Sequence, residues 1–395
     1  MMIKLLHTAD FHFGKVSNVD IDVQHPDFTD PINIRLSDTF DRFDTMIDYS
    51  IENDIDYFII AGDLYDRPTV KNAIKKSVAK RVKRLIDNGV AVIIVVGNHD
   101  TDGDTSALSE LAILVDGNKM LKVIDKPKIV RKQDIDFYCV PYFVGIEKKL
   151  DDVLSKLTEK RDFKKPMVGI SHLAVSGCRV GPTEVPLTAK TQPEQLAGFV
   201  YVGLGDFHIY QKVGEGTRVG NGNRIYYSGS PLRLNMGEPE KKYFNVVSIE
   251  EGDLGFPKDI EQIELPDRQY ISGSMSYQLM VKKFKKLESS GKIAIGSKIV
   301  KKGSVVKLNC DCIRALSAKA YKLGELMSKQ LHELGVLSVD IKWTFAKKAI
   351  RDDSFDATTS IEDAINTRIE NNPPKKFSKV AAKRSAKEML DSVRS

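Results

Sequence analysis

The chain of 395 residues contains few cysteines and a single tryptophan. Its four cysteines, Cys139, Cys178, Cys310 and Cys312, form no Cys-x-x-Cys pair. Structural zinc sites use cysteine pairs of that spacing, and small secreted domains use many cysteines in disulfides. The sequence therefore indicates neither a zinc knuckle nor a disulfide framework, and we expect the protein in a reducing, cytoplasmic compartment.

Long hydrophobic runs are also absent. The longest, Val90–Val96, is far too short to cross a bilayer, which takes about 20 apolar residues. The first residues, Met-Met-Ile-Lys-Leu-Leu-His, become polar too early for a signal peptide. We therefore expect no membrane association. The sequence also lacks the Gly-x-x-x-x-Gly-Lys-[Ser/Thr] loop that cradles nucleotide phosphates, so any dependence on ATP has to come from a partner.

The net charge of +6 hides an uneven distribution. Residues 281–303 hold eight lysines and one glutamate, and residues 371–395 hold seven lysines and arginines against two acids. The remaining chain is therefore net negative, at −6. An acidic body with basic appendages fits an enzyme that acts on a polyanion, although either lysine run alone would be ordinary solvated surface.

The pattern of apolar residues divides the chain into three parts. Strands and helices alternate through residues 1–265, which predicts an α/β domain with clear amphipathic helices near 36–53 and 70–88. Residues 266–350 predict a small α+β domain, and residues 351–395 predict a linker followed by C-terminal helices. The last strand of the small domain alternates polar residues with four apolar ones, Val339, Ile341, Trp343 and Phe345. We expect Trp343 to pack in the core of that domain.

Five predicted strands of the first domain each run into side chains that can bind a metal. These side chains are Asp10 and His12; Asp63; Asn98, His99 and Asp100; His172; and Asp206 and His208. In an open α/β sheet the chemistry lies beyond the carboxyl ends of the strands, so residues far apart in sequence can meet there. Mixed carboxylate, imidazole and amide ligands suit Mn²⁺ or a similar divalent cation better than thiolate-seeking Zn²⁺. A single aspartate of this kind is usually a turn residue, but the ordered set predicts a metal site.

In this order, the motifs Asp10-x-His12, Gly62-Asp63, Gly97-Asn98-His99-Asp100, His172 and Asp206-x-His208 resemble those of the calcineurin-like metallophosphoesterase superfamily. The segments Leu-Leu-His7-Thr-Ala-Asp10-Phe-His12-Phe-Gly14, Ala-Gly62-Asp63-Leu-Tyr-Asp66 and Tyr227-Ser-Gly-Ser-Pro231 resemble the SbcD-type double-strand-break repair nucleases in particular. The resemblance implies a four-layer α/β/β/α catalytic domain, followed by a DNA-capping domain over residues 266–350.

The resemblance also implies roles for individual residues. Two divalent cations, with Mn²⁺ favoured and Mg²⁺ the alternative, would share Asp63 as a bridging ligand. The first would bind Asp10, His12 and His208, and the second Asn98, His172 and residue 206. The catalytic residues would be His99, which would approach the phosphate, and Asp100, which could orient it. The family usually has His-x-His where this chain has Asp206-Phe-His208, so metal preference or second-metal binding could be altered.

The function implied is a metal-dependent DNA exonuclease on duplex ends and endonuclease on single strands, in DNA repair, recombination or replication. The expected partners are DNA, a SbcC-type coiled-coil ATPase and a second copy in a homodimer, in a cytoplasmic, nucleoid-associated setting. Candidate DNA contacts are Lys282, Lys283, Lys285 and Lys286, and candidate docking residues for the ATPase are Ile361, Ala364, Ile365 and Ile369. Two alternatives stay open. One is a phosphatase or nucleotide phosphodiesterase on the same fold, and the other is a catalytically weak DNA-end scaffold.

Overall fold

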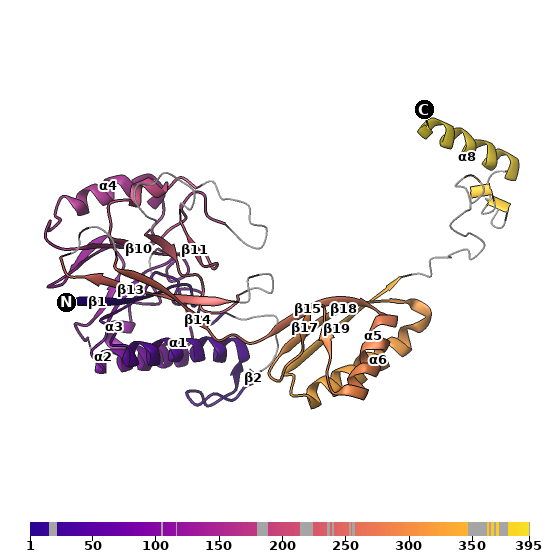
Figure 1. The fold of residues 1–395 in the computed structure, drawn as a ribbon, viewed down its shortest axis with the longest axis horizontal. Coiled ribbons are helices and arrows are strands. Elements are labelled where there is room, and N and C mark those ends of the chain that lie inside the picture. The colour runs from indigo at the N-terminus through magenta and orange to yellow at the C-terminus, as the bar shows by residue number, and fades with distance from the viewer. Residues whose placement is uncertain are drawn as a thin grey trace.

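The structure is a computed structural model. It describes residues 1–15, 22–103, 106–115, 117–179, 189–213, 224–234, 238, 241–252, 254, 257–346, 362, 365–366, 369–370 and 378–394. The first domain contains two six-stranded sheets that pack face to face. A smaller domain follows it, and one helix near the C-terminus stands apart from both (Figure 1).

The first sheet has the order β14-β13-β1-β4-β5-β6. Its parallel strands are β1 (Met2–Thr8), β4 (Tyr57–Ile60), β5 (Ala91–Val95) and β6 (Leu121–Ile124), and its antiparallel edge is formed by β13 (Lys242–Glu250) and β14 (Asp259–Leu265). The parallel strands of the second sheet are β12 (Ile225–Tyr227), β10 (Tyr201–Gly205), β9 (Met167–His172) and β8 (Asp136–Val140), flanked by antiparallel β11 (Gln211–Lys212) and β7 (Lys128–Arg131). Two short strands, β2 (Asp22–Val23) and β3 (Ile32–Asn33), pair outside both sheets.

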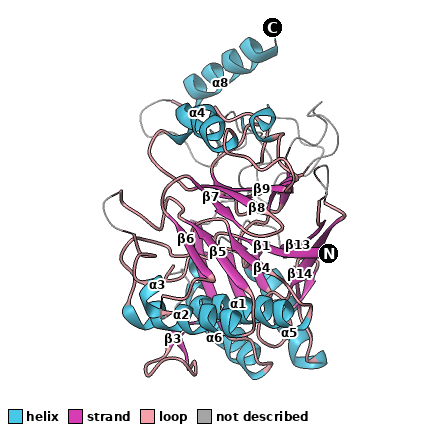
Figure 2. Ribbon diagram, turned by 90° about the vertical axis from the view of Figure 1, so that its left-hand side faces the viewer, coloured by secondary structure: helices cyan, strands magenta, loops and turns pink. Residues whose placement is uncertain are grey.

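Helices cover the outer face of each sheet (Figure 2). The first sheet carries α1 (Ile34–Glu52), α2 (Asn72–Asp87) and the short α3 (Leu111–Leu114), and the second carries α4 (Ile146–Thr158). A third apolar layer between the sheets includes Leu5, Ile93 and Phe137. Because alternate residues of a strand point to opposite faces, strands buried on both faces are apolar throughout, as β5 is. The predicted four-layer α/β/β/α fold is confirmed.

The basic face of α2 is largely neutralised within the domain. Arg81 contacts Asp27 and Asp44, Lys80 also contacts Asp27, and Arg84 contacts Asp48. These acids lie in α1 or in the segment just before it, so the sequence of α2 could not predict that its basic side chains would be paired. The pairs support a structural role for this face rather than a nucleic-acid contact.

The small domain is a three-stranded sheet covered by two helices on one face. Its elements are β15 (Tyr270–Ser276), α5 (Tyr277–Ser290), a hairpin of β16 (Ala294–Ile295) and β17 (Lys298–Ile299), β18 (Val305–Ile313), a 3₁₀ turn (Arg314–Leu316), α6 (Ser317–Glu333) and β19 (Ser338–Ala346). The sheet order is β15-β18-β19, and all three strands are parallel. The alternating pattern that predicted an α+β domain could not specify this direction.

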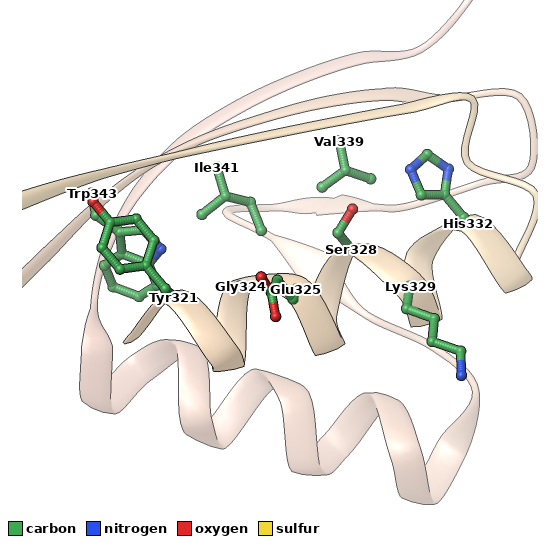
Figure 3. A pocket seen from close by; sticks show the side chains of 9 residues that line it. All are labelled: Tyr321, Gly324, Glu325, Ser328, Lys329, His332, Val339, Ile341 and Trp343. Atoms are coloured by element: carbon green, nitrogen blue, oxygen red, sulfur yellow. The ribbon is translucent and has the colours of Figure 1, made fainter. Parts of the chain in front are cut away.

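Trp343 packs against the apolar core of the small domain, as expected, but it is only half buried. It lines an open hollow of about 480 Å³ between α6 and the edge strand β19 (Figure 3). Its indole packs beside Gly324, where a Cβ would lie 3.1 Å from the indole nitrogen. Within the described residues β19 is the edge strand of the sheet, so none of their strands covers this side of the indole.

Charged side chains join the two domains. Arg268 donates to both carboxylate oxygens of Asp38 in α1, and the Tyr270 hydroxyl donates to the same group at 3.3 Å. Arg233 of the first domain donates to Asp267 and to the carbonyl of Arg268. The predicted boundary after residue 265 lies between β14 and β15, at the start of this charged joint.

The C-terminal region is described only in part. Helix α8 (Lys379–Arg394) is paired through Lys379 and Lys383 with Glu370. Ile365 and Ile369 lie in helical turns and are half buried, whereas Ile361 and Ala364 lie outside the described residues. None of the helices within the described parts of the chain is long and apolar enough to span a bilayer.

Candidate metal centre

The strand ends of both sheets bring the predicted ligands together at one edge of the sandwich. Asp10 and His12 follow β1, Asp63 follows β4, and Asn98 follows β5 from the first sheet. His172 ends β9, and Asp206 and His208 follow β10 in the second sheet. Ligand atoms of Asp10, His12 and His208 lie within 4.8 Å of one another, as do those of Asp10, Asp63 and His172.

The backbone is strained at several of these positions. Five non-glycine residues in the described parts of the chain have a positive φ, and four of them are predicted ligands: Asp10, His12, Asp63 and Asp206, with φ of 56°, 50°, 51° and 103°. Side chains with a Cβ rarely adopt this region, and such strain concentrates at functional sites. The sharp turns aim consecutive polar side chains back across the ends of the strands.

Asp63 lies between two groups of ligands. Its Oδ2 is 3.5 Å from Nε2 of His12 and 3.5 Å from Nε2 of His172. Its Oδ1 accepts a hydrogen bond from the backbone N–H of His99 at 2.9 Å. This placement is what a bridging carboxylate requires. We call Asp10, His12 and His208 with Asp63 the first subsite, and Asn98, His172 and Asp206 with Asp63 the second subsite.

Two glycines allow this close approach. A Cβ at Gly62, which has a φ of 95°, would lie 2.1 Å from Nδ1 of His172. A Cβ at Gly97 would lie 2.2 Å from Oδ1 of Asp63. Any larger residue at either position would displace a candidate ligand. This steric limit explains why glycine precedes Asp63 and Asn98 in the motifs.

In the second subsite, acceptor atoms point at one another. Nδ1 of His172 faces the Ala61 carbonyl at 2.9 Å, so Nδ1 carries the hydrogen and the Nε2 lone pair points away from Ala61. That Nε2 lies 2.9 Å from the amide oxygen of Asn98 and 3.9 Å from Oδ1 of Asp206. Oxygen and imidazole acceptors converging in this way fit a divalent cation. The backbone N–H of Asp206 donates to Asp10 and ties the two subsites together.

The first subsite repeats this arrangement. Nε2 of His12 and Nε2 of His208 are 3.3 Å apart. Their Nδ1 atoms face carboxylates, Asp66 behind His12 and Glu238 behind His208, each at 3.4 Å. Hydrogens on both Nδ1 atoms leave two lone pairs directed at one space, which a shared cation would satisfy. The residues of both subsites therefore fit the predicted pair of metals.

His99 and Asp100 have separate surroundings. Nδ1 of His99 bonds the backbone carbonyl of Asp66 at 2.9 Å, and its ring stands edge-on to His12 with centroids 4.7 Å apart. Asp100 is fully buried and accepts the backbone N–H groups of Tyr65 and Gly97. It holds two loops together and does not bond the His99 ring, which corrects the expectation that Asp100 orients His99.

Three supporting residues were missed by sequence reasoning. Asp66 lies three residues after Asp63 in the same turn, a spacing that could have suggested its position behind His12. Glu238 and Lys242, which form a buried ion pair beside His208, carry no sequence signal because no motif includes them.

A profile of the calcineurin-like phosphoesterase family matches residues 3–187. The profile covers 185 of the 395 residues, just under half of the chain, so this part of the chain is similar to that family. The match includes the first four motifs and ends before Asp206 and His208, which the fold alone brings to the site. The match and the candidate ligand groups together indicate a metal-dependent hydrolase.

Two solved structures are similar to this chain. A dimetal phosphatase from Danio rerio shares 12% identity over 67% of this chain and 99% of its own, with a TM-score of 0.39. The nuclease MPE of Pseudomonas putida shares 18% identity over 46% of this chain and 66% of its own, with a TM-score of 0.24.

The electrostatics of the phosphoesterase domain reflect an excess of buried carboxylates. Burial and the neighbouring charge of Asp63 raise the pKa of Asp100 to about 7. Burial alone would lower the pKa of His172, but the carboxylates of Asp63, Asp10 and Asp206 raise it to about 10. Burial also raises the pKa of Asp206, and His172 only partly offsets this rise. The buried carboxylates therefore require positive charge nearby. Protons on His172 and on the carboxylates provide it when no cation is bound.

This balance predicts that cation binding to the phosphoesterase domain releases protons. His172 holds a proton at pH 7 because its pKa is raised to about 10, and a cation binds only the deprotonated ring. Affinity should therefore rise with pH below that pKa, by ~10-fold per pH unit for one displaced proton. Calorimetric titration with Mn²⁺ in two buffers of different ionisation enthalpy measures the release. Identical heats in both buffers would contradict the prediction.

Proposed function

We propose that the protein is a two-metal DNA nuclease of the SbcD type, active on duplex ends and on single strands in DNA repair, recombination or replication. The observation that carries this proposal is the position of Asp63, 3.5 Å from an imidazole of each subsite. Two bound cations, most suitably Mn²⁺, would hold a phosphodiester and supply a nucleophile at neutral pH. A phosphate ester is the substrate that this arrangement suits.

His99 is the residue best placed to assist the reaction beside the two cations. His99 is partly exposed, and its ligand atom lies within 4.8 Å of those of His12 and Asp63, so its ring can approach a phosphate or the leaving oxygen from the rim of the first subsite. The Asp66 carbonyl fixes that ring by holding Nδ1. A hydrogen-bond or charge donor held in this way lowers the barrier by stabilising charge that develops in the transition state.

The second domain favours a polymeric substrate over a small phosphomonoester. Lys282, Lys285 and Lys286 are exposed on α5, whereas Lys283 is half buried and donates to the carbonyl of Ala294. We therefore assign DNA contact to the three exposed lysines and a structural role to Lys283. A phosphatase or nucleotide phosphodiesterase would have little use for this basic surface.

The test compares three substrates with the same enzyme in Mn²⁺: end-labelled duplex DNA, circular single-stranded DNA and p-nitrophenyl phosphate. We expect cleavage of both DNAs and little turnover of the monoester. The reverse preference would support the phosphatase alternative. Binding of DNA ends without any hydrolysis would support the scaffold alternative.

Neutralising the exposed lysines should weaken DNA binding without regard to sequence. We expect the triple substitution of Lys282, Lys285 and Lys286 by Gln to lower affinity and to reduce the slope of log K against log [salt] by about 0.9 for each lost phosphate contact on a duplex. Fluorescence anisotropy across a salt series measures both effects. Lys283→Gln is the matched control, and a triple variant with an unchanged slope would remove α5 from the DNA surface.

An ATPase partner of the SbcC type is proposed to bind the C-terminal helices. Helix α8 stands apart from both domains, and the described turns around Ile365 and Ile369 are joined to it through Glu370 (Figure 1). We expect Ile365→Asp to abolish co-purification with the ATPase and to leave Mn²⁺-dependent cleavage by the nuclease alone unchanged. Retained co-purification would place the docking surface elsewhere.

A further inference from the structure

A buried carboxylate stands behind one ligand of the first subsite. Glu238 lies between β12 and β13, and its side chain is 5% exposed. Its Oε1 is 3.4 Å from Nδ1 of His208, the ring nitrogen that points away from the subsite. A carboxylate in this position fixes the orientation and the tautomer of a metal-binding imidazole.

Neighbouring donors fix the carboxylate in turn. Oε2 of Glu238 accepts hydrogen bonds from the ammonium of Lys242 at 2.7 Å and from the backbone N–H of Leu234 at 3.1 Å. The same ammonium donates to the backbone carbonyl of His208 at 2.8 Å and to the Ser230 hydroxyl at 3.0 Å. Lys242 therefore holds both the backbone of His208 and the group behind its ring.

We propose that Glu238, held by Lys242, is the positioning residue of His208 in the first subsite, keeping the hydrogen of His208 on Nδ1 so that Nε2 is free to bind a cation. This inference rests on the proposed metal-dependent function. It explains why a lysine is buried against the backbone of a candidate ligand, where its charge would otherwise oppose cation binding. Glu238 offsets that charge, and Lys242 fixes the carboxylate.

Glu238→Gln tests the proposal with little change of volume. Two donors occupy the Oε2 position, so the amide oxygen of glutamine should take that position and turn its NH₂ group toward His208. The ring would then be driven to carry its hydrogen on Nε2, which blocks the cation. We expect Mn²⁺ affinity for one of two sites to fall ~10–100-fold by calorimetry, the usual range for such supporting carboxylates.

The matched control is Glu264→Gln. Glu264 accepts from Lys241, the residue next to Lys242, at the same 2.7 Å, but this pair is exposed. We expect the control to bind two cations like the wild type. Equal binding by Glu238→Gln and the wild type would overturn the proposal. A wild type that binds no cations would instead contradict the proposed function, so the two failures are distinguishable without any DNA.

A double-mutant cycle separates positioning from a general structural effect. If Glu238 acts through His208, adding Glu238→Gln to His208→Ala should weaken Mn²⁺ binding no further. A further loss of the full single-mutant size would contradict the proposal. Should Glu238→Gln fail to fold, nitrogen NMR of ¹⁵N-histidine in the wild type decides. A hydrogen on Nδ1 of His208 in the cation-bound protein supports the proposal, and one on Nε2 overturns it.

Discussion

Replacing Asp63 by Asn should abolish hydrolysis and remove bound metal. One oxygen of Asp63 lies at equal distances from imidazoles of both subsites, so its charge serves both cations. Asn can still accept the backbone N–H of His99 through its amide oxygen, which preserves the local fold. We expect a fall in kcat of ~10³-fold or more, which corresponds to the several kcal/mol that bound cations contribute. Cleavage assays and metal analysis of the purified variant measure both effects.

Two controls make this result specific. Asp54→Asn changes another aspartate of positive φ, at 52°, in an exposed turn away from the site, and it should have no effect. Asp206→Ala should weaken only the second subsite, since Asp206 faces His172 and not His12. An Asp63→Asn variant that keeps two cations and normal rates would show that Asp63 is not the bridge.

Replacing His99 by Ala should separate chemistry from metal binding. The His99 ring is held by a backbone carbonyl and lies outside both subsites as we define them. We therefore expect two cations and DNA to bind as in the wild type while kcat falls ~10²–10⁴-fold, the usual effect of removing a proton or charge donor. Single-turnover cleavage together with Mn²⁺ calorimetry measures the separation.

His332→Ala is the matched control for this variant. Its ring also bonds a backbone carbonyl through Nδ1 at 2.9 Å, but it lies in the small domain. Full activity is expected of it. Loss of a cation from His99→Ala would make His99 a ligand, and unchanged kcat would exclude it from the chemistry.

The sequence was sufficient to predict which polar side chains would lie together because each candidate ligand follows an apolar strand of a parallel sheet. The direction of those strands brings their ends to one edge, and this geometry does not depend on the length of the chain between them. The four-layer fold was predictable because the motifs at these strand ends resemble those of a family with that fold. The four lysines on α5 were predicted as DNA contacts from the lysine-rich run alone, which could not show that Lys283 donates to a carbonyl of the neighbouring hairpin.

The supporting contacts could not be predicted because they join segments without a common pattern. The resemblance implied that Asp100 could orient His99, but its carboxylate accepts the backbone N–H groups of Tyr65 and Gly97 instead. Glu238 precedes β13, whose antiparallel register places its first residues past the carboxyl end of β1, where His208 also contacts His12. Trp343 alternates correctly, yet its strand is at the edge of the sheet, a position that alternation does not reveal.

The most direct test of the metal centre is anomalous X-ray diffraction from crystals of the protein soaked in Mn²⁺, recorded at the manganese absorption edge. We predict two anomalous peaks roughly 3.5–4 Å apart, one on each side of the Asp63 carboxylate. One peak should contact His12 and His208, and the other Asn98, His172 and Asp206. The two-metal assignment would be contradicted if fully soaked crystals showed no peak in this cluster, or only a single peak without contact to Asp63.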